Sequence, residues 1–239
     1  MTVAEILKAA KWIAMGFGRD GLVLDLGSGS SPHPRADVLC DRYLGSTLHR
    51  RADLTRDRPL VCADMCALPF RTKAFVFAFC RMALEHIDPI NVPAALREIS
   101  RVAVSGYIEI PSPIREMLMP DPAHKSFIEL EGDGLVVTPK ATLAPFPPVG
   151  YALGRWRQEN AAWRRFVSEH DDLLTVRFWW TGSIPHRIAA PGIVPAALAA
   201  SQKDVVELFS RAETSSSPGR LRPAIRALTR IAFHVARRS

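Results

Sequence analysis

The sequence predicts an α/β protein whose core is a doubly wound, mostly parallel sheet. Three observations lead to this fold: short apolar runs recur along the first half of the chain, several end in an acid or a glycine-rich turn, and a helical stretch separates two of them. Near-continuous apolar strands are typical of parallel sheets, whose two faces are both covered. The chain has 239 residues, 48% of them apolar, enough to bury a substantial core. It contains no run of eighteen apolar residues, so no membrane-spanning helix is predicted.

The first predicted strand runs into a glycine-rich turn at residues 22–29, LVLDLGSG. Gly27 and Gly29 carry no Cβ, so the backbone there can turn sharply and approach a ligand closely. Asp25 stands near the carboxyl end of this strand, where open α/β sheets bind their ligands. We therefore expect a cofactor at this end of the sheet. A nicotinamide-dependent reductase is disfavoured, because Pro32 stands where the dinucleotide fingerprint has its third glycine.

The following apolar runs continue the pattern. Residues 36–41 predict a second strand ending in Asp41, and residues 59–64 a third ending in Asp64. Further strands are predicted at 74–80 and 106–110, with a helix at 94–103 between them.

Four segments in this order resemble the motifs of the class I S-adenosylmethionine-dependent methyltransferases. They are DLGSG at 25–29, the strand-end acid Asp41, DMCALPF at 64–70 and LEH at 84–86. The resemblance covers roughly residues 20–113. It implies a Rossmann-like fold, S-adenosylmethionine as the cofactor and methyl transfer as the activity.

The resemblance also implies roles for single residues. It assigns Asp41 to the two ribose hydroxyls, Asp64 to the adenine amino group and Met65 to the face of the adenine ring. A carboxylate suits the ribose because it offers two oxygens to two neighbouring donors. The full set of candidate cofactor-binding residues is Asp25, Gly27, Ser28, Gly29, Asp41, Arg42, Asp64, Met65 and Arg81.

Two features depart from the family pattern. Only ten residues lead from Gly27 to Asp37, and Pro32 and Pro34 interrupt them, whereas a parallel crossover usually needs a dozen or more. The first helix is therefore expected to be very short or replaced by a turn. Val76 stands where relatives often have an aspartate at the start of the fourth strand.

His86 is the first candidate for a general base, since it follows the fourth strand near the expected methyl group. Glu109 and His124 are weaker candidates, and the alternative for His86 is a structural hydrogen bond to a backbone carbonyl.

No metal site is predicted, because the four cysteines form no Cys-x-x-Cys pair and have no partner histidine cluster. They are interpreted as buried thiols of a reducing cytoplasm.

The second half of the chain predicts an insertion and closing strands. Alternating runs at 127–130 and 135–138 flank a glycine-containing turn and predict a hairpin inserted after the fifth strand. A helix is predicted at 151–168. Strands at 173–180 and 186–189 would complete a seven-stranded sheet.

The predicted organisation is a methyltransferase domain at residues 1–212 followed by a basic tail. Within the domain the core covers 20–113, the insertion that shapes the acceptor pocket about 114–170, and the closing strands about 171–190. The N-terminal 18 residues are interpreted as an amphipathic covering helix rather than a secretory signal.

The tail, residues 213–239, combines a flexible linker with an amphipathic helix. From Arg211 onward the chain has seven arginines and one acid, which is +6 of its net charge of +7. The remainder is near neutral, so no nucleic-acid partner is expected. A basic amphipathic helix suits an anionic membrane surface or an acidic partner; the alternative is a terminal helix docked on the domain. The protein is therefore expected to be cytoplasmic, with peripheral membrane contact through the tail.

The functional hypothesis is methyl transfer from S-adenosylmethionine to a small-molecule, sugar or lipid-linked glycan acceptor, with O-methylation favoured. The alternative is a non-catalytic protein of the same fold that acts as a cofactor-binding subunit or scaffold.

Overall fold

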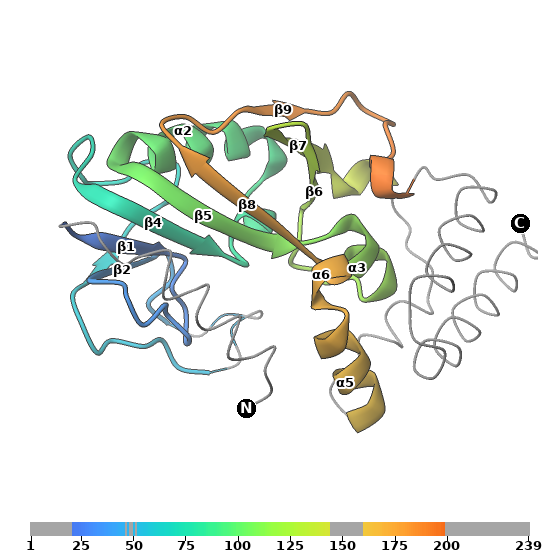
Figure 1. Ribbon diagram of the computed structural model, residues 1–239, viewed down its shortest axis with the longest axis horizontal. Helices are drawn as coiled ribbons and strands as arrows, with labels where there is room; N and C mark the ends of the chain where they lie inside the picture. Colours follow the sequence, from blue (N-terminus) through green and yellow to red (C-terminus); the bar gives the residue numbers. More distant parts are fainter. Residues whose placement is uncertain (1–20, 46, 48–49, 51, 144–159, 199–239) are drawn as a thin grey trace, which may run out of the picture. The chain divides into compact units, whose positions relative to one another are not determined.

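The computed structural model describes residues 21–45, 47, 50, 52–143 and 160–198 (Figure 1). The chain divides into two compact units, Met1–Pro195 and Ala196–Ser239. The described part of the second unit is the short 3₁₀ helix η4 (Ala196–Leu198). The expectations for the N-terminal helix and for the tail at 213–239 fall outside the described residues. In the described part of the chain no helix is both long and apolar enough to cross a membrane.

The main sheet has the order β3-β2-β1-β4-β5-β8. The first five of these strands pair in parallel, and β8 pairs antiparallel with β5. The chain therefore leaves the central strand β1 in one direction toward β3 and then returns to build the other half from β4 onward. This reversal places a topological switch point between β1 and β4, where open α/β sheets bind ligands. The strands are β1 (Val23–Leu26), β2 (Val38–Asp41), β3 (Leu60–Cys62), β4 (Phe75–Arg81), β5 (Ala103–Pro111) and β8 (Thr175–Thr181).

A hairpin at the predicted place follows β5 and the helix α3 (Pro113–Leu118). Its strands β6 (Ser126–Glu131) and β7 (Gly134–Pro139) pair antiparallel. The strand β9 (His186–Ile188) pairs in parallel with β7 and forms a second, three-stranded sheet.

The position of β9 corrects the expectation of one seven-stranded sheet. Among the described residues the main sheet has six strands, because β9 extends the hairpin instead. The physical reason is that β7 still has an open edge: the backbone N–H of Leu135 and the C=O of Val137 bond to residues of the β9 segment, Pro185 and Ala189. Strand propensity alone does not reveal which of two open edges a short segment will join.

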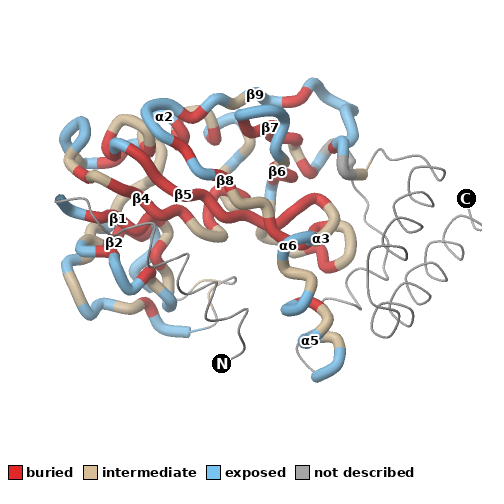
Figure 2. Tube along the Cα trace, viewed as in Figure 1, coloured by how far each residue is buried: buried red, intermediate tan, exposed pale blue. Residues whose placement is uncertain are grey.

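The helix α2 (Val92–Val102) covers one face of the main sheet because its apolar residues recur at helical spacing. Val92, Ala95, Leu96, Ile99 and Val102 are fully buried. They share one core cluster with residues of β1, β4, β5 and β8 and with the hairpin residues Ile128, Leu135 and Val137. Figure 2 shows long runs of buried residues along β4 and β5, whereas β8 is buried at only three of its seven residues.

The connection from β1 to β2 replaces the first helix of the fold. Residues 27–37, all of which the structure describes, form turns and no helix, as the short spacing predicted. The His33 ring from this connection stacks on Phe79 with ring centroids 3.7 Å apart. A stacked imidazole therefore covers part of the sheet face that a crossover helix would otherwise cover.

The remaining helices are short. Ser112 caps α3 by accepting a hydrogen bond from the Arg115 N–H. The structure describes the predicted helix at 151–168 only from residue 160 onward, and α5 begins at Ala161. The other helical elements are η1 (Leu84–His86), η2 (Pro89–Asn91), η3 (Lys140–Leu143), α5 (Ala161–Glu169) and α6 (Asp171–Leu174).

Gly106 lets β4, β5 and β8 pack closely, and Gly106→Ala should destabilise the fold. A Cβ at this position would lie 2.4 Å from the Ala78 carbonyl oxygen and 2.7 Å from the Trp180 ring. Since one neighbour is backbone, we expect a loss of about 1–3 kcal/mol in the free energy of unfolding, measured by urea denaturation.

Gly45→Ala is the matched control, because a Cβ there would meet nothing within 4 Å. Equal stability of the two variants would show that the sheet adjusts to a side chain at Gly106 without cost.

Candidate functional site

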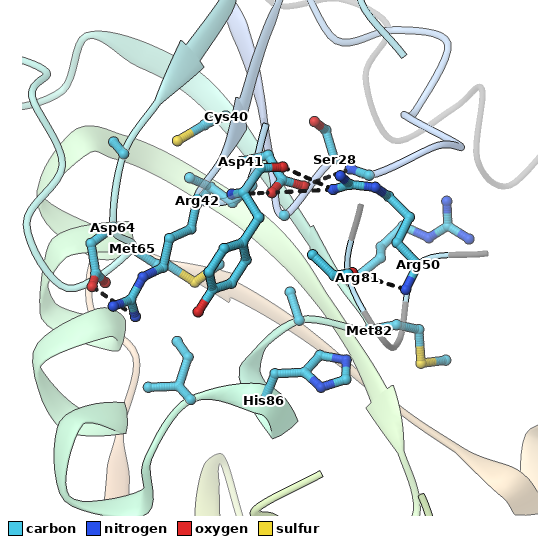
Figure 3. Close-up of a pocket in the computed structure, with 18 of the residues that line it drawn as sticks. Ser28, Cys40, Asp41, Arg42, Arg50, Asp64, Met65, Arg81, Met82 and His86 are labelled. Atoms are coloured by element: carbon cyan, nitrogen blue, oxygen red, sulfur yellow. Dashed lines mark hydrogen bonds and ion pairs between the residues drawn. The ribbon is translucent and has the colours of Figure 1, made fainter. Parts of the chain in front are cut away.

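A cavity of about 840 Å³ opens at the carboxyl ends of β1, β2, β3 and β4. This volume lies in the upper part of the range of small-molecule and cofactor sites. Its lining includes every candidate cofactor-binding residue and the first candidate for the base, namely Asp25, Gly27, Ser28, Gly29, Asp41, Arg42, Asp64, Met65, Arg81 and His86. In Figure 3, Asp41 and Ser28 lie toward the top of the view, Asp64 and Met65 to the left, and His86 below them.

The glycine-rich turn after β1 has the left-handed backbone that favours glycine. The φ angles are 66° at Gly27 and 54° at Gly29. A Cβ on Gly27 would lie 2.6 Å from that of Ala83, so the turn is also packed against the segment that follows β4. The Oγ of Ser28 is buried without a protein hydrogen-bond partner. A buried hydroxyl in this state is satisfied when a polar ligand binds beside it.

Asp41 ends β2 with its carboxylate already held by the protein. Oδ2 accepts from the Gly29 N–H at 3.1 Å, and Oδ1 accepts from the Tyr43 N–H at 2.8 Å. The Arg50 guanidinium lies 3.6 Å from Oδ1. Each carboxylate oxygen has a second lone pair, so Asp41 keeps capacity to accept from a ligand. These bonds fix the orientation of the carboxylate before any ligand arrives.

Asp64 follows β3 and belongs to a more open part of the cavity. Its Oδ1 accepts from the Cys66 N–H at 2.8 Å, and its Oδ2 pairs with Arg42 at 3.0 Å. Both side chains of this pair are substantially exposed, at 60% for Arg42 and 39% for Asp64. An exposed ion pair is worth at most about 1 kcal/mol. A ligand can therefore displace Arg42 from Asp64 at little cost.

Asp25 is more deeply buried and connects β1 with the turn region that replaces the first helix. Its Oδ2 accepts from the His33 N–H at 2.6 Å. Burial raises the pKa of Asp25 to about 6, although the hydrogen bond from His33 acts in the opposite direction. Burial also lowers the pKa of the stacked His33 ring to about 4, with Arg81, Arg35 and Arg58 adding to the effect. The carboxylate thus borders the cavity and also organises the polypeptide beneath it.

Glu109 does not line the cavity and is bound within the sheet. It accepts from the Tyr107 hydroxyl at 2.6 Å and lies 3.5 Å from Arg81 Nε and 3.7 Å from Arg177 Nε. Burial and the bond to Glu109 raise the pKa of Tyr107. This ion pairing explains why an acid at the end of β5 serves the fold and positions Arg81, the cavity residue. The prediction that Glu109 is a candidate for the general base is therefore wrong.

His86 lies at the end of η1 and borders the cavity on the side opposite the β2 acid. Its Nδ1 is 3.3 Å from the Ala123 carbonyl oxygen, and its ring meets the His124 ring edge-on at 4.7 Å. His124 is outside the cavity lining. The position of His86 is therefore compatible with both alternatives from the sequence: a general base, and a residue that makes a structural hydrogen bond to a backbone carbonyl.

Behind His86 lies a buried group of charges formed by Glu85, Glu116, His124 and Lys140. His124 Nδ1 is 2.6 Å from Glu116 Oε1, and Lys140 Nζ donates to Glu116 Oε2 at 2.6 Å. Burial raises the pKa of Glu85 to about 7. Burial lowers the pKa of His124, but the hydrogen bond to Glu116 and the negative charges of Glu116, Glu85 and Asp121 together outweigh burial, so the pKa is raised.

The cavity also contains residues that sequence reasoning did not single out. Arg50 donates to the carbonyl oxygens of Tyr43 at 3.0 Å and of Gly45, which holds its guanidinium beside Asp41. Lys125, just before β6, and Asn91 also line the cavity. None of these residues lies in a strand-end motif.

All four cysteines are free thiols, but only Cys40 and Cys80 are buried, so the expectation of buried thiols is confirmed for two of the four. Burial raises the pKa of Cys40 to about 12 and that of Cys66 to about 11. Cys62 is exposed.

The fold and cavity define an α/β protein with a cavity suited to a cofactor, and comparison with known families bears on its class. Residues 24–108 match the model of a methyltransferase domain family. This match, over 85 of the 239 residues, supports the class I S-adenosylmethionine-dependent methyltransferase superfamily and S-adenosylmethionine as the cofactor.

Three of the solved structures that are similar to this chain are given as examples. YcgJ from Bacillus subtilis is 18% identical with a TM-score of 0.37, over 48% of this chain and 59% of that one. PH0226 from Pyrococcus horikoshii OT3 is 14% identical with a TM-score of 0.38, over 64% and 79%. A SAM-dependent methyltransferase from Archaeoglobus fulgidus is 19% identical with a TM-score of 0.39, over 54% and 63%. Among curated proteins, none matches this chain.

Asp25→Asn should change the pH dependence of stability. The pKa of Asp25 is raised from 3.8 to about 6 on folding, so its contribution is full below pH 4 and is lost as the pH rises through 6. Asparagine does not titrate, so the variant does not lose this stability as the pH rises. The free energy of unfolding of the variant minus that of wild type should therefore increase by about 2–2.5 kcal/mol between pH 4 and pH 7.

Urea denaturation across this pH range provides the measurement. The lowered pKa of His33 makes the stability of both proteins rise with pH over the same range. This contribution is the same in the variant and in wild type, so it cancels in the difference between their free energies of unfolding. Asp133→Asn in the exposed hairpin turn is the control for loss of a carboxylate. If the difference in the free energy of unfolding between Asp25→Asn and wild type stays constant with pH, the raised pKa of Asp25 is contradicted.

Proposed function

We propose that this chain transfers the methyl group of S-adenosylmethionine to an oxygen atom of a small-molecule, sugar or lipid-linked glycan acceptor. One observation carries the proposal. The glycine turn after β1 and the acids after β2 and β3 line a single cavity, and a histidine lines it from the other side. The methyltransferase domain match favours this activity over a purely structural use of the fold.

The residues of the cavity fit the cofactor. The unpartnered Ser28 hydroxyl and the left-handed turn at Gly27 and Gly29 leave room and a donor for a polar ligand close to the backbone. Asp41, fixed by two backbone N–H groups, would accept from the ribose hydroxyls. Asp64, whose exposed partner Arg42 is easily displaced, would accept from the adenine amino group, with Met65 against the ring.

The cofactor supplies a methyl group that its sulfonium already activates. The protein therefore has mainly to hold the acceptor oxygen in line with that group and to exclude water, which can contribute up to about 7–11 kcal/mol in well-oriented systems. Transfer forms the oxygen–carbon bond as the sulfur–carbon bond breaks with its electron pair staying on sulfur. The acceptor's proton must then leave.

His86 is placed to receive that proton. A carbonyl oxygen only accepts hydrogen bonds, so its contact with Nδ1 favours the tautomer with the proton on Nδ1 and the basic lone pair on Nε2. An alcohol acceptor gains from a base because its hydroxyl is weakly acidic, and this supports oxygen as the atom methylated. Lys125, from the segment leading into β6, lines the same wall and links the insertion to acceptor binding.

The lipid-linked option rests on the basic tail at 213–239. We propose that this segment makes peripheral contact with an anionic membrane or an acidic partner, as its seven-arginine composition from residue 211 onward suggests.

Asp41→Asn and Asp64→Asn should weaken S-adenosylmethionine binding. Each removes a charged acceptor, so we expect a loss of about 1.5–3 kcal/mol, roughly tenfold to over a hundredfold in Kd, by calorimetry. The matched control is Asp133→Asn, which lies far from the cavity lining in the hairpin turn. Binding by Asp41→Asn with the wild-type Kd would refute the ribose assignment.

His86→Gln should slow methyl transfer without weakening cofactor binding. Loss of a general base typically costs about a hundred- to ten-thousandfold in rate. The readout is S-adenosylhomocysteine formed with a panel of phenols, sugars and isoprenoid-linked glycans. Wild-type binding without turnover on any acceptor would favour the scaffold alternative, and an undiminished rate in His86→Gln would remove the histidine from the mechanism.

A further inference from the structure

We propose that Glu85, His86 and His124 form a binding site for a divalent transition-metal ion of the Zn²⁺, Co²⁺ and Fe²⁺ class, at the wall of the cavity opposite Asp41. One side-chain ligand atom from each of the three residues lies within 4.8 Å of the other two. Two imidazoles and one carboxylate are a ligand set typical of zinc and non-haem iron sites with open coordination positions.

Glu85 is the first reason to assign a cation. Its side chain is 1% exposed, and neither carboxylate oxygen has a hydrogen-bond partner in the described structure. His124 Nε2 lies 4.0 Å from Oε1. A fully buried carboxyl group without hydrogen bonds is costly unless something at its oxygens compensates. A metal ion between Glu85 and His124 would do so.

The histidines are oriented as metal ligands usually are. A ligating histidine typically donates its second ring N–H to a carboxylate or backbone carbonyl. His124 Nδ1 meets Glu116 Oε1 at 2.6 Å, and His86 Nδ1 meets the Ala123 carbonyl oxygen at 3.3 Å. Both rings can therefore present Nε2 to the ion.

A second shell holds this arrangement in place. Glu116 is 1% exposed and takes a second bond from Lys140 Nζ, which also donates to the Asp121 carbonyl oxygen. Asp121 Oδ2 lies 3.9 Å from His124 Nε2, so a further oxygen stands close to the site. The contributors come from η1, α3, the loop before β6 and η3. Such fixed support around three ligands is what separates a built site from a chance group of charges.

Binding requires only a small contraction. Ligand atoms about 2.0–2.2 Å from a tetrahedral zinc ion are about 3.3–3.6 Å apart, against the present limit of 4.8 Å. His86 lines the cavity whereas Glu85 is closed to solvent, so the open coordination position would face the cavity.

The consequence for chemistry rests on the proposed function. An acceptor hydroxyl bound at the open position would have a lowered pKa and would lose its proton to water. In the metal-loaded protein His86 then acts as a ligand, and its role as a proton acceptor applies to the metal-free protein. The metal site itself is tested without cofactor or acceptor, so its failure and that of the proposed function are separate results.

The test is titration of the full chain, without a polyhistidine tag and after treatment with a chelator, with Co²⁺ and with Zn²⁺. We expect one ion per chain and a visible Co²⁺ spectrum of imidazole and carboxylate ligands without the near-ultraviolet charge-transfer band of thiolates. Glu85→Gln and His124→Gln should weaken binding more than about 100-fold, beyond the 10- to 100-fold typical of second-shell changes, which Glu116→Gln should show. His186→Gln in β9, whose ring bonds the Ile184 carbonyl, is the matched control and should bind as wild type.

Circular dichroism establishes that each variant is folded. Wild type that binds no ion, a thiolate spectrum, or wild-type affinity in a folded Glu85→Gln or His124→Gln would each overturn the site. If those variants do not fold, the wild-type stoichiometry and Co²⁺ spectrum still decide between a metal centre and a purely structural group of charges.

Discussion

The parallel pairing of β1 with β2 on one side and β4 on the other is the constraint on which the site depends. This pairing aligns Leu26 with Cys40 and with Cys80, so three strand ends stop at one level. The Gly27 and Ser28 N–H groups then bond the Cys40 carbonyl oxygen and fold the turn back over β2. The acid that ends β2 is consequently held against the glycine turn by main-chain geometry. A shift of one residue in either pairing would send every side chain at these ends to the other face of the sheet.

The burial of β1 secures this pairing. All four of its residues are buried, with Leu24 and Leu26 in the core that α2 and the hairpin complete, and Val23 in the cluster on the other face. Packing on both faces makes the strand insensitive to changes at its exposed ends. The polar chemistry of the cavity is thereby built on a rigid apolar support, as a site with fixed carboxylates requires.

The parts of the fold that follow from local pattern could be predicted from the sequence. The apolar run into Gly27, the acids at 41 and 64 and the helical spacing of Leu96 and Ile99 each depend on neighbours in the chain, and the structure has the corresponding strands and helix. The partner of β9 was predicted incorrectly because edge pairing depends on which edge lies near in space. The group formed by Glu85, Glu116 and His124 was missed for the same reason. Its members are separated by up to 39 residues, and they come together because β6 packs against both η1 and α3.

The tight connection between β1 and β2 has a consequence for how ligands are distinguished. A crossover helix would aim its positive end, with several unpaired N–H groups, at the charged amino-acid portion of a bound cofactor. Here turns and the His33 stack occupy that stretch of chain. On the proposed assignment of Asp41 and Asp64, selectivity would come mostly from the sugar and the base, while the methionine end would depend on a few individual side chains. Adenosine fragments that lack the amino acid would accordingly compete with the intact molecule more effectively than they do where a dipole anchors that end.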